Sequence, residues 1–79
     1  MALETLIETI AKALVQYPDE VEVGVFDEDD NSIVVELRVA PEDVGKVIGR
    51  DGRTAQHMRT LLSATTSKMG RRAHLDILD

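Results

Sequence analysis

The period of the hydrophobic pattern switches along this 79-residue chain, and the switching restricts the possible folds more than any other feature. Apolar residues first recur every three to four positions, which predicts an amphipathic helix over residues 2–16, where a Tyr-Pro pair ends the pattern. Apolar and polar residues then alternate over residues 21–25 and 33–39, which predicts two strands. Because only the polar run 27–32 separates these strands, we expect them to form a hairpin.

The helical period returns after Pro41, and the chain closes with one more alternating segment. Pro41 favours a helix start, with Glu42 and Asp43 in the first turn, where the helix dipole stabilises acids. A Gly-Arg-Asp-Gly sequence ends this short helix, and a longer helix follows until Gly70, before a strand over residues 73–77. The residues that we expect on the buried face of the longer helix are Ala55, Met58, Leu62, Thr65 and Met69.

The resulting order, α-β-β-α-α-β, predicts one α+β domain over residues 1–79, in which helices cover one face of a three-stranded sheet. The absence of cysteine removes disulfides, cysteine-based zinc sites and thiol catalysis. No apolar run approaches the roughly 18 residues that a membrane span requires. The N-terminal segment is acidic where a signal peptide is basic, so we expect a cytoplasmic protein without a membrane anchor.

The net charge of −6 hides a strong division between the two parts of the chain. Residues 1–43 carry 12 acids against two bases, whereas residues 44–79 carry seven bases against three acids. The bases of the second part are Lys46, Arg50, Arg53, Arg59, Lys68, Arg71 and Arg72. Because a polyanion responds to the local field, these residues can attract nucleic acid to a molecule that is acidic on average.

Two glycines separated by two residues stand between the last two helices, and they do not fit the common phosphate-binding motifs. Arg50 follows Gly49 where a Walker A loop has lysine, and the spacing of Gly45, Gly49 and Gly52 differs from the dinucleotide-binding pattern. Gly49 and Gly52 have no side chains to hold a phosphate backbone away, and the next helix begins with unpaired N–H groups. With Arg50 and Arg53, they predict a sugar-phosphate site; the alternative is a tight turn that needs glycine only for its backbone angles.

The sequence VIGRDGR at residues 47–53, set within the order α-β-β-α-α-β, resembles the KH domain in its bacterial type II arrangement. The resemblance implies that the loop clamps about four single-stranded nucleotides while their bases lie in an apolar groove beside a strand. It also implies a variable loop beside the groove at residues 68–72, although bases there are equally typical of a solvated helix end. The candidate RNA-binding residues are Val44, Lys46, Ile48, Gly49, Arg50, Asp51, Gly52, Arg53, Arg71 and Arg72.

Three patterns that could indicate metal or catalytic chemistry do not hold. Asp27, Asp29 and Asn31 alternate as in a calcium-binding loop, but Ser32 replaces its glycine and Arg38 replaces its terminal glutamate. The two histidines lie far apart, without cysteine or a zinc-binding pattern around them. No serine has a nucleophile-elbow motif or an obvious paired base. We therefore expect no metal, no cofactor, no small-molecule substrate and no enzymatic activity.

One side of the longer helix is less polar than a fully solvated surface. Its residues are Arg53, His57, Thr60, Leu61, Ala64 and Lys68. Leu61 either widens the core face, or stands alone in water, or belongs to a surface where two such helices pack across a two-fold axis. The KH resemblance implies pairing with a second copy and with a larger KH-containing protein. A dimer would carry two glycine loops and gain avidity for RNA.

These features together predict a non-enzymatic protein that binds single-stranded RNA. Only Tyr17 and Phe26 are aromatic, and both are distant from the glycines in sequence, so we expect a modest base preference. The KH resemblance adds an RNA-chaperone or post-transcriptional role linked to cell shape and envelope homeostasis. The rival interpretation is a protein-interaction module that acts through the Leu61 side of the longer helix, and a third is a small-molecule sensor of similar architecture.

Overall fold

The computed structural model describes residues 3–78, which form three α-helices, three strands and three short 3₁₀ turns. The helices and strands are α1 (Leu3–Leu14), β1 (Glu22–Asp29), β2 (Ser32–Arg38), α2 (Val44–Ile48), α3 (Arg53–Ser67) and β3 (Arg72–Leu78). The 3₁₀ turns are Pro18–Glu20, Pro41–Asp43 and Arg50–Gly52. This order confirms the predicted α-β-β-α-α-β arrangement. Among residues 3–78 the structure has no helix with the length and hydrophobicity of a membrane span.

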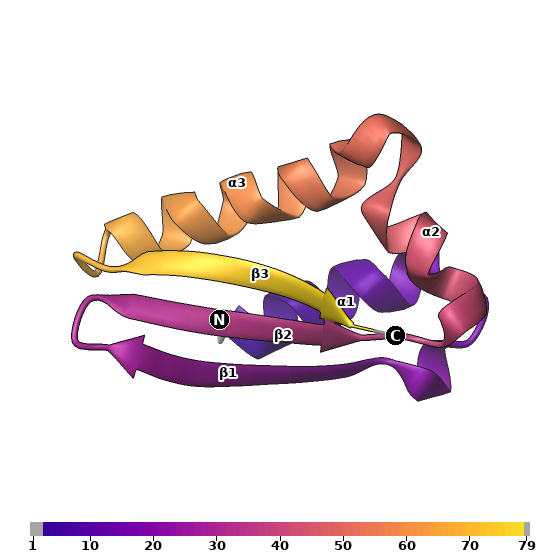
Figure 1. The fold of residues 1–79 in the computed structure, drawn as a ribbon, viewed down its shortest axis with the longest axis horizontal. Coiled ribbons are helices and arrows are strands. Elements are labelled where there is room, and N and C mark those ends of the chain that lie inside the picture. Colours follow the sequence, from indigo (N-terminus) through magenta and orange to yellow (C-terminus); the bar gives the residue numbers. More distant parts are fainter. Residues whose placement is uncertain (1–2, 79) are drawn as a thin grey trace.

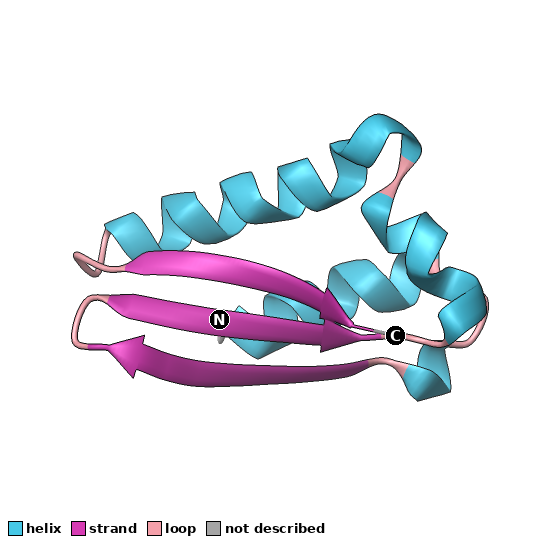
Figure 2. Ribbon diagram, in the orientation of Figure 1, coloured by secondary structure: helices cyan, strands magenta, loops and turns pink. Residues whose placement is uncertain are grey.

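The sheet is mixed, with β2 in the centre: β1 pairs with it antiparallel and β3 pairs with it parallel. All three helices lie on one side of the sheet, and α3 runs along β3 (Figure 1, Figure 2). The core lies between the helices and the inner side chains of the strands. Its buried members are Ile7, Ala11, Val21, Ile33, Val35, Leu37, Val39, Val47, Met58, Leu62 and Leu75.

The first helix is shorter than the hydrophobic pattern predicts. It ends at Leu14 rather than at residue 16, because the N–H groups of Gln16 and Tyr17 donate to the carboxylate of Asp43 instead of continuing the helix. The start expected at residue 2 lies outside the described residues.

The hairpin is longer than predicted, because most of the polar run 27–32 belongs to the strands. Only Asp30 and Asn31 form the turn, and β1 contains an irregularity between Asp27 and Asp29. Backbone pairing and the guanidinium of Arg71 hold this polar segment: Arg71 Nη2 lies 2.7 Å from Asp27 Oδ1 and also donates to the carbonyl oxygens of Asp29 and Ser32.

The buried face of α3 is also shifted by one position near its end. Ala55, Met58 and Leu62 are buried as predicted, but the next buried residue is Thr66, not Thr65. Its hydroxyl donates to the carbonyl of Leu62 at 2.8 Å, which satisfies the polar group inside the core. Met69 was predicted on this face as well, but the helix ends at Ser67 and leaves Met69 54% exposed.

Candidate nucleic-acid interface

Residues 49–52, here called the glycine loop, turn the chain sharply between α2 and α3. Three of the four have positive φ angles: 80° at Gly49, 56° at Asp51 and 75° at Gly52. The Gly52 N–H donates to the Gly49 carbonyl at 3.1 Å and closes the turn. Aspartate is one of the few non-glycine residues that tolerate this conformation, which accounts for Asp51 at its position.

The two glycines have different physical reasons for lacking a side chain. A Cβ at Gly49 would collide with the side chain of Thr54 and lie 2.8 Å from the Thr54 backbone nitrogen. A Cβ at Gly52 would meet no other atom within 4 Å. Gly49 is therefore required by the fold itself, whereas the space beside Gly52 is open to an approaching molecule.

The start of α3 creates a positive electrostatic potential beside this open space. Gly52 is the N-cap of α3 and no side chain caps the helix, so N–H groups of its first turn are left for another acceptor. The 15-residue helix directs the positive end of its dipole toward the loop. Arg50 and Arg53 are both exposed and add full positive charges, whereas the exposed carboxylate of Asp51 partly offsets them.

A groove of about 380 Å³ lies beside the glycine loop and reaches from α2 across the start of α3 to β3. Ile48, at the end of α2, is 39% exposed at one side of the groove, while the neighbouring Val47 is fully buried in the core. Arg59 Nη2 lies 3.4 Å from the Leu75 carbonyl oxygen, so this guanidinium reaches from α3 to β3. The lining residues are Ile48, Gly52, Ala55, Arg59, Leu75, Asp76, Ile77 and Leu78.

Comparison with known protein families matches residues 4–77 to the KH domain of KhpA and KhpB. The chain belongs to this KH family. It is 49% identical to the RNA-binding protein KhpA of Halalkalibacterium halodurans over 77 residues, which cover 98% of this chain and 100% of the relative. It is 53% identical to that of Borreliella burgdorferi (94% of this chain, 89% of the relative) and 45% identical to that of Aquifex aeolicus (99% and 98%).

The KH fold brings together six of the ten candidate RNA-binding residues and leaves four elsewhere. Ile48, the glycine loop and Arg53 follow one another in the chain, and of these six Ile48 and Gly52 line the groove. Val44 instead packs against the core, and Lys46 lies 3.3 Å from the carboxylate of Asp43. Arg71 and Arg72 lie at the other end of α3, which spans about 22 Å over its 15 residues. Arg71 is also held by the hairpin.

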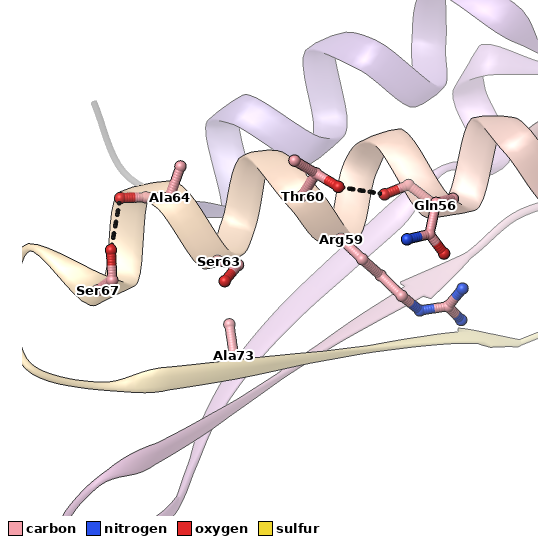
Figure 3. A pocket seen from close by; sticks show the side chains of 7 residues that line it. All are labelled: Gln56, Arg59, Thr60, Ser63, Ala64, Ser67 and Ala73. Carbon is pink, nitrogen blue, oxygen red and sulfur yellow. Dashed lines mark hydrogen bonds between the residues drawn. The ribbon is translucent and has the colours of Figure 1, made fainter.

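The KH groove contains residues that sequence reasoning does not single out, chiefly Arg59 and the end of β3. Arg59 follows Ala55 by one helical turn, and this spacing could have placed both on the side of α3 next to Gly52. Only the packing of α3 along β3 shows which strand completes the groove. A second, shallower hollow of about 510 Å³ continues from Arg59 along α3, where Ser63 faces Ala73 of β3 (Figure 3).

A buried carboxylate fixes the start of α2 and therefore the position of the glycine loop. Asp43 is fully buried, and its two oxygens accept the Gln16 N–H at 3.1 Å and the Tyr17 N–H at 3.0 Å. Burial alone would raise the pKa of Asp43, but these hydrogen bonds and Lys46 outweigh it and hold the pKa below its usual value. Asp43 stands in the first helical turn as predicted, but its main contacts join α1 to α2.

The outer side of α3 is exposed along its length, including Arg53, His57, Thr60 and Ala64. Leu61 is 46% exposed and lies outside the core cluster, so the interpretation that it widens the core face is wrong. The structure leaves it as an exposed, large apolar side chain on a surface that is mostly polar.

Proposed function

We propose that this chain binds single-stranded RNA in the groove beside the glycine loop, without catalysis. The observation that carries the proposal is the open space at Gly52, which adjoins the uncapped start of α3 and lies between Arg50 and Arg53. A helix start of this kind favours an anion. The relatives in three bacterial genera are named RNA-binding proteins, which supports RNA as the anion's source.

In the proposed mechanism the protein holds the sugar-phosphate backbone and only weakly distinguishes bases. Arg50 and Arg53 neutralise phosphates, while N–H groups at the start of α3 donate to a phosphate oxygen. The bases lie against Ile48 and the end of β3, with Arg59 beside them as a donor. Among the described residues no aromatic side chain lines this groove, so base stacking does not strengthen the binding.

Charge reversal at the loop tests the proposal. Arg50→Asp removes a phosphate contact and places two acids side by side in the loop, so we expect at least about tenfold weaker binding of a single-stranded RNA at low salt. Arg38→Asp is the matched control, since Arg38 is an exposed arginine on β2 that does not line the groove. Equal affinities of the wild type and R50D, measured by fluorescence anisotropy, would exclude the proposed site.

The cellular role is proposed from the KH family resemblance. It is a cytoplasmic RNA-chaperone or post-transcriptional function linked to cell shape and envelope homeostasis. Crosslinking of RNA in cells, followed by sequencing of the recovered RNA, tests this role. Recovery of transcripts for envelope and cell-shape proteins is the expected result, and a recovery equal to that of R50D would contradict it.

A second candidate function is protein interaction through the outer side of α3, as a homodimer or with a larger KH-containing protein. The observation that favours it is Leu61, whose side chain is 46% exposed on this side. We expect Leu61→Glu to yield a monomer in sedimentation experiments, while Leu14→Glu, at a leucine 41% exposed on α1, leaves the mass unchanged. An L61E protein with the mass of the wild type would remove this candidate.

A further inference from the structure

The face of the sheet opposite the helices is uncovered among residues 3–78 (Figure 1, Figure 2). Alternate residues of β2, such as Val35 and Leu37, are buried toward the helices, so their neighbours point to the other side. The register arranges the outward side chains in three rows. The rows are Phe26, Val34 and His74; Gly24, Glu36 and Asp76; and Glu22, Arg38 and Leu78. These nine residues are called the open face below.

An exposed aromatic ring occupies the first row. Phe26 is the single phenylalanine of the chain and is 54% exposed. Its ring packs over Gly24, because a Cβ at Gly24 would lie 2.8 Å from a ring carbon. This packing explains the glycine in the strand. It leaves more than half of Phe26 in water, where a partner could cover it.

Two carboxylates of the open face occupy neighbouring positions on adjacent strands. Glu36 and Asp76 are paired positions on β2 and β3, and like charges in such positions repel. Neither forms an ion pair with another residue in the described part of the chain. Arg38 lies opposite Glu22 of β1 in the strand register, and among residues 3–78 no ion pair joins it to Glu36 or Asp76. A cation supplied from outside would relieve the repulsion between Glu36 and Asp76.

The ring of Phe26 and the carboxylate of Glu36 adjoin a hollow of about 210 Å³. Gly24, Phe26 and Leu78 provide apolar surface in it, and the acids Glu22 and Glu36 outnumber the one lining base, Arg38, so that the lining is negative on balance. An arginine side chain has both complementary features, since its stem is apolar and its guanidinium stacks on aromatic rings and pairs with carboxylates. RNA does not fit this combination, because its phosphates would face the carboxylates.

We propose that the open face binds a protein partner that presents an arginine on an apolar segment. Phe26 contacts the arginine, and Glu36 and Asp76 pair with its charge. This surface goes beyond the proposed RNA function, because it lies on the side of the sheet away from the helices whereas the RNA groove runs between α2, α3 and β3. The two surfaces adjoin at β3, because Asp76 and Leu78 of the open face also line the RNA groove.

An NMR titration of the ¹⁵N-labelled chain tests the proposal with a defined probe. The probe is the peptide acetyl-Leu-Arg-Leu-Arg-amide, and acetyl-Leu-Glu-Leu-Glu-amide is its acidic control. We expect saturable shifts of the amides of Gly24, Phe26 and Glu36 with the basic peptide alone. Glu36→Gln should weaken its binding roughly threefold, the effect of one exposed ion pair. Phe26→Leu should weaken it by a similar factor. Glu42→Gln, at an exposed glutamate outside the open face, should leave it unchanged.

Several results would overturn the proposal. They are the absence of saturable shifts at millimolar peptide, an equal response to the acidic peptide, shifts confined to the glycine loop, and equal affinity of the wild type and E36Q. If dilution of the free protein moves the same amides, the open face binds a second copy and the proposal is wrong. The NMR shifts are assigned to individual residues, so a negative peptide titration leaves the RNA proposal unaffected. Likewise, a loss of RNA binding in R50D does not test the open face.

Discussion

At the scale of single residues, the two glycines of the glycine loop have different reasons for lacking a side chain, although the sequence motif does not distinguish them. Gly49 has no room for a Cβ because of Thr54, whereas Gly52 faces open space. Both have positive φ angles, so both favour glycine for their backbone. The turn interpretation therefore accounts for Gly49 completely, but it does not account for the free volume beside Gly52.

Alanine substitutions should separate these roles. We expect Gly49→Ala to destabilise the fold by about 2 kcal/mol or more, because it combines a collision with a backbone conformation that alanine avoids. Gly52→Ala should cost only about 1 kcal/mol but weaken RNA binding, because its methyl group occupies the proposed phosphate site. Urea denaturation and anisotropy measure the two effects.

Gly45→Ala is the matched control, because Gly45 lies in α2 with no atom near the added methyl group. It should keep RNA affinity and raise stability slightly, since alanine is the better helix former. An RNA affinity of G52A equal to that of G45A would contradict the role assigned to Gly52.

Asp43 gives the protein a predictable response to acid. Its pKa is lower in the folded state than in the unfolded chain, so its carboxylate stabilises the fold fully above the unfolded pKa of about 3.9. This contribution is lost as the pH falls through the lower folded pKa. We expect the urea midpoint to fall below pH 4 and to change less over this range in Asp43→Asn, which should also be less stable at pH 7.

The control for this experiment is Glu42→Asn, at the exposed neighbouring acid, which should keep the acid response of the wild type. Identical pH profiles for D43N and the wild type would contradict the role of Asp43 in joining α1 to α2.

At the scale of elements, the end of α3 and the start of β3 hold the hairpin. Arg71 reaches Asp27 and the carbonyl oxygens of Asp29 and Ser32, and the Arg72 N–H donates to the Asn31 carbonyl at 2.7 Å. The basic turn therefore lies against the acidic hairpin, at the end of α3 away from the glycine loop.

We expect Arg71→Gln to lower stability by about 1 kcal/mol, since it removes an ion pair whose acid is largely exposed. The same variant should leave RNA affinity unchanged, because Arg71 does not line the groove. Thermal denaturation measures the stability and fluorescence anisotropy measures the RNA affinity. The matched control is Arg72→Gln, at the neighbouring exposed arginine. If R71Q kept its stability and lost RNA binding, the result would contradict this assignment and show that Arg71 contacts RNA.

At the scale of the whole molecule, hydrophobic period was enough to predict the element order and the one-sided sheet. The hydrophobic period did not predict the features that depend on tertiary contacts. The polar ends of the hairpin are strands because they pair and because Arg71 holds them. Thr66 rather than Thr65 faces the core, although both hydroxyls donate to a carbonyl of their own helix. The contact of Asp43 with Gln16 spans 27 positions, which no local pattern encodes.

The candidate site was predictable only in its local part. The glycine loop and Arg53 are contiguous in sequence, so a motif finds them. Arg59 and the end of β3 join them only after α3 has packed along β3. The charge division between the two parts of the chain is kept in space only in part: the glycine loop carries exposed arginines, whereas Arg71 lies against the acidic hairpin.

The most direct test of the central claim is an NMR titration of the ¹⁵N-labelled chain with a single-stranded RNA hexamer at low salt. We predict that the largest amide shifts lie at residues 48–55, at Arg59 and at residues 75–78, and that they shrink as salt is raised. Shifts concentrated on the hairpin, on residues 68–72 or on the outer side of α3, with none at the glycine loop, would contradict it.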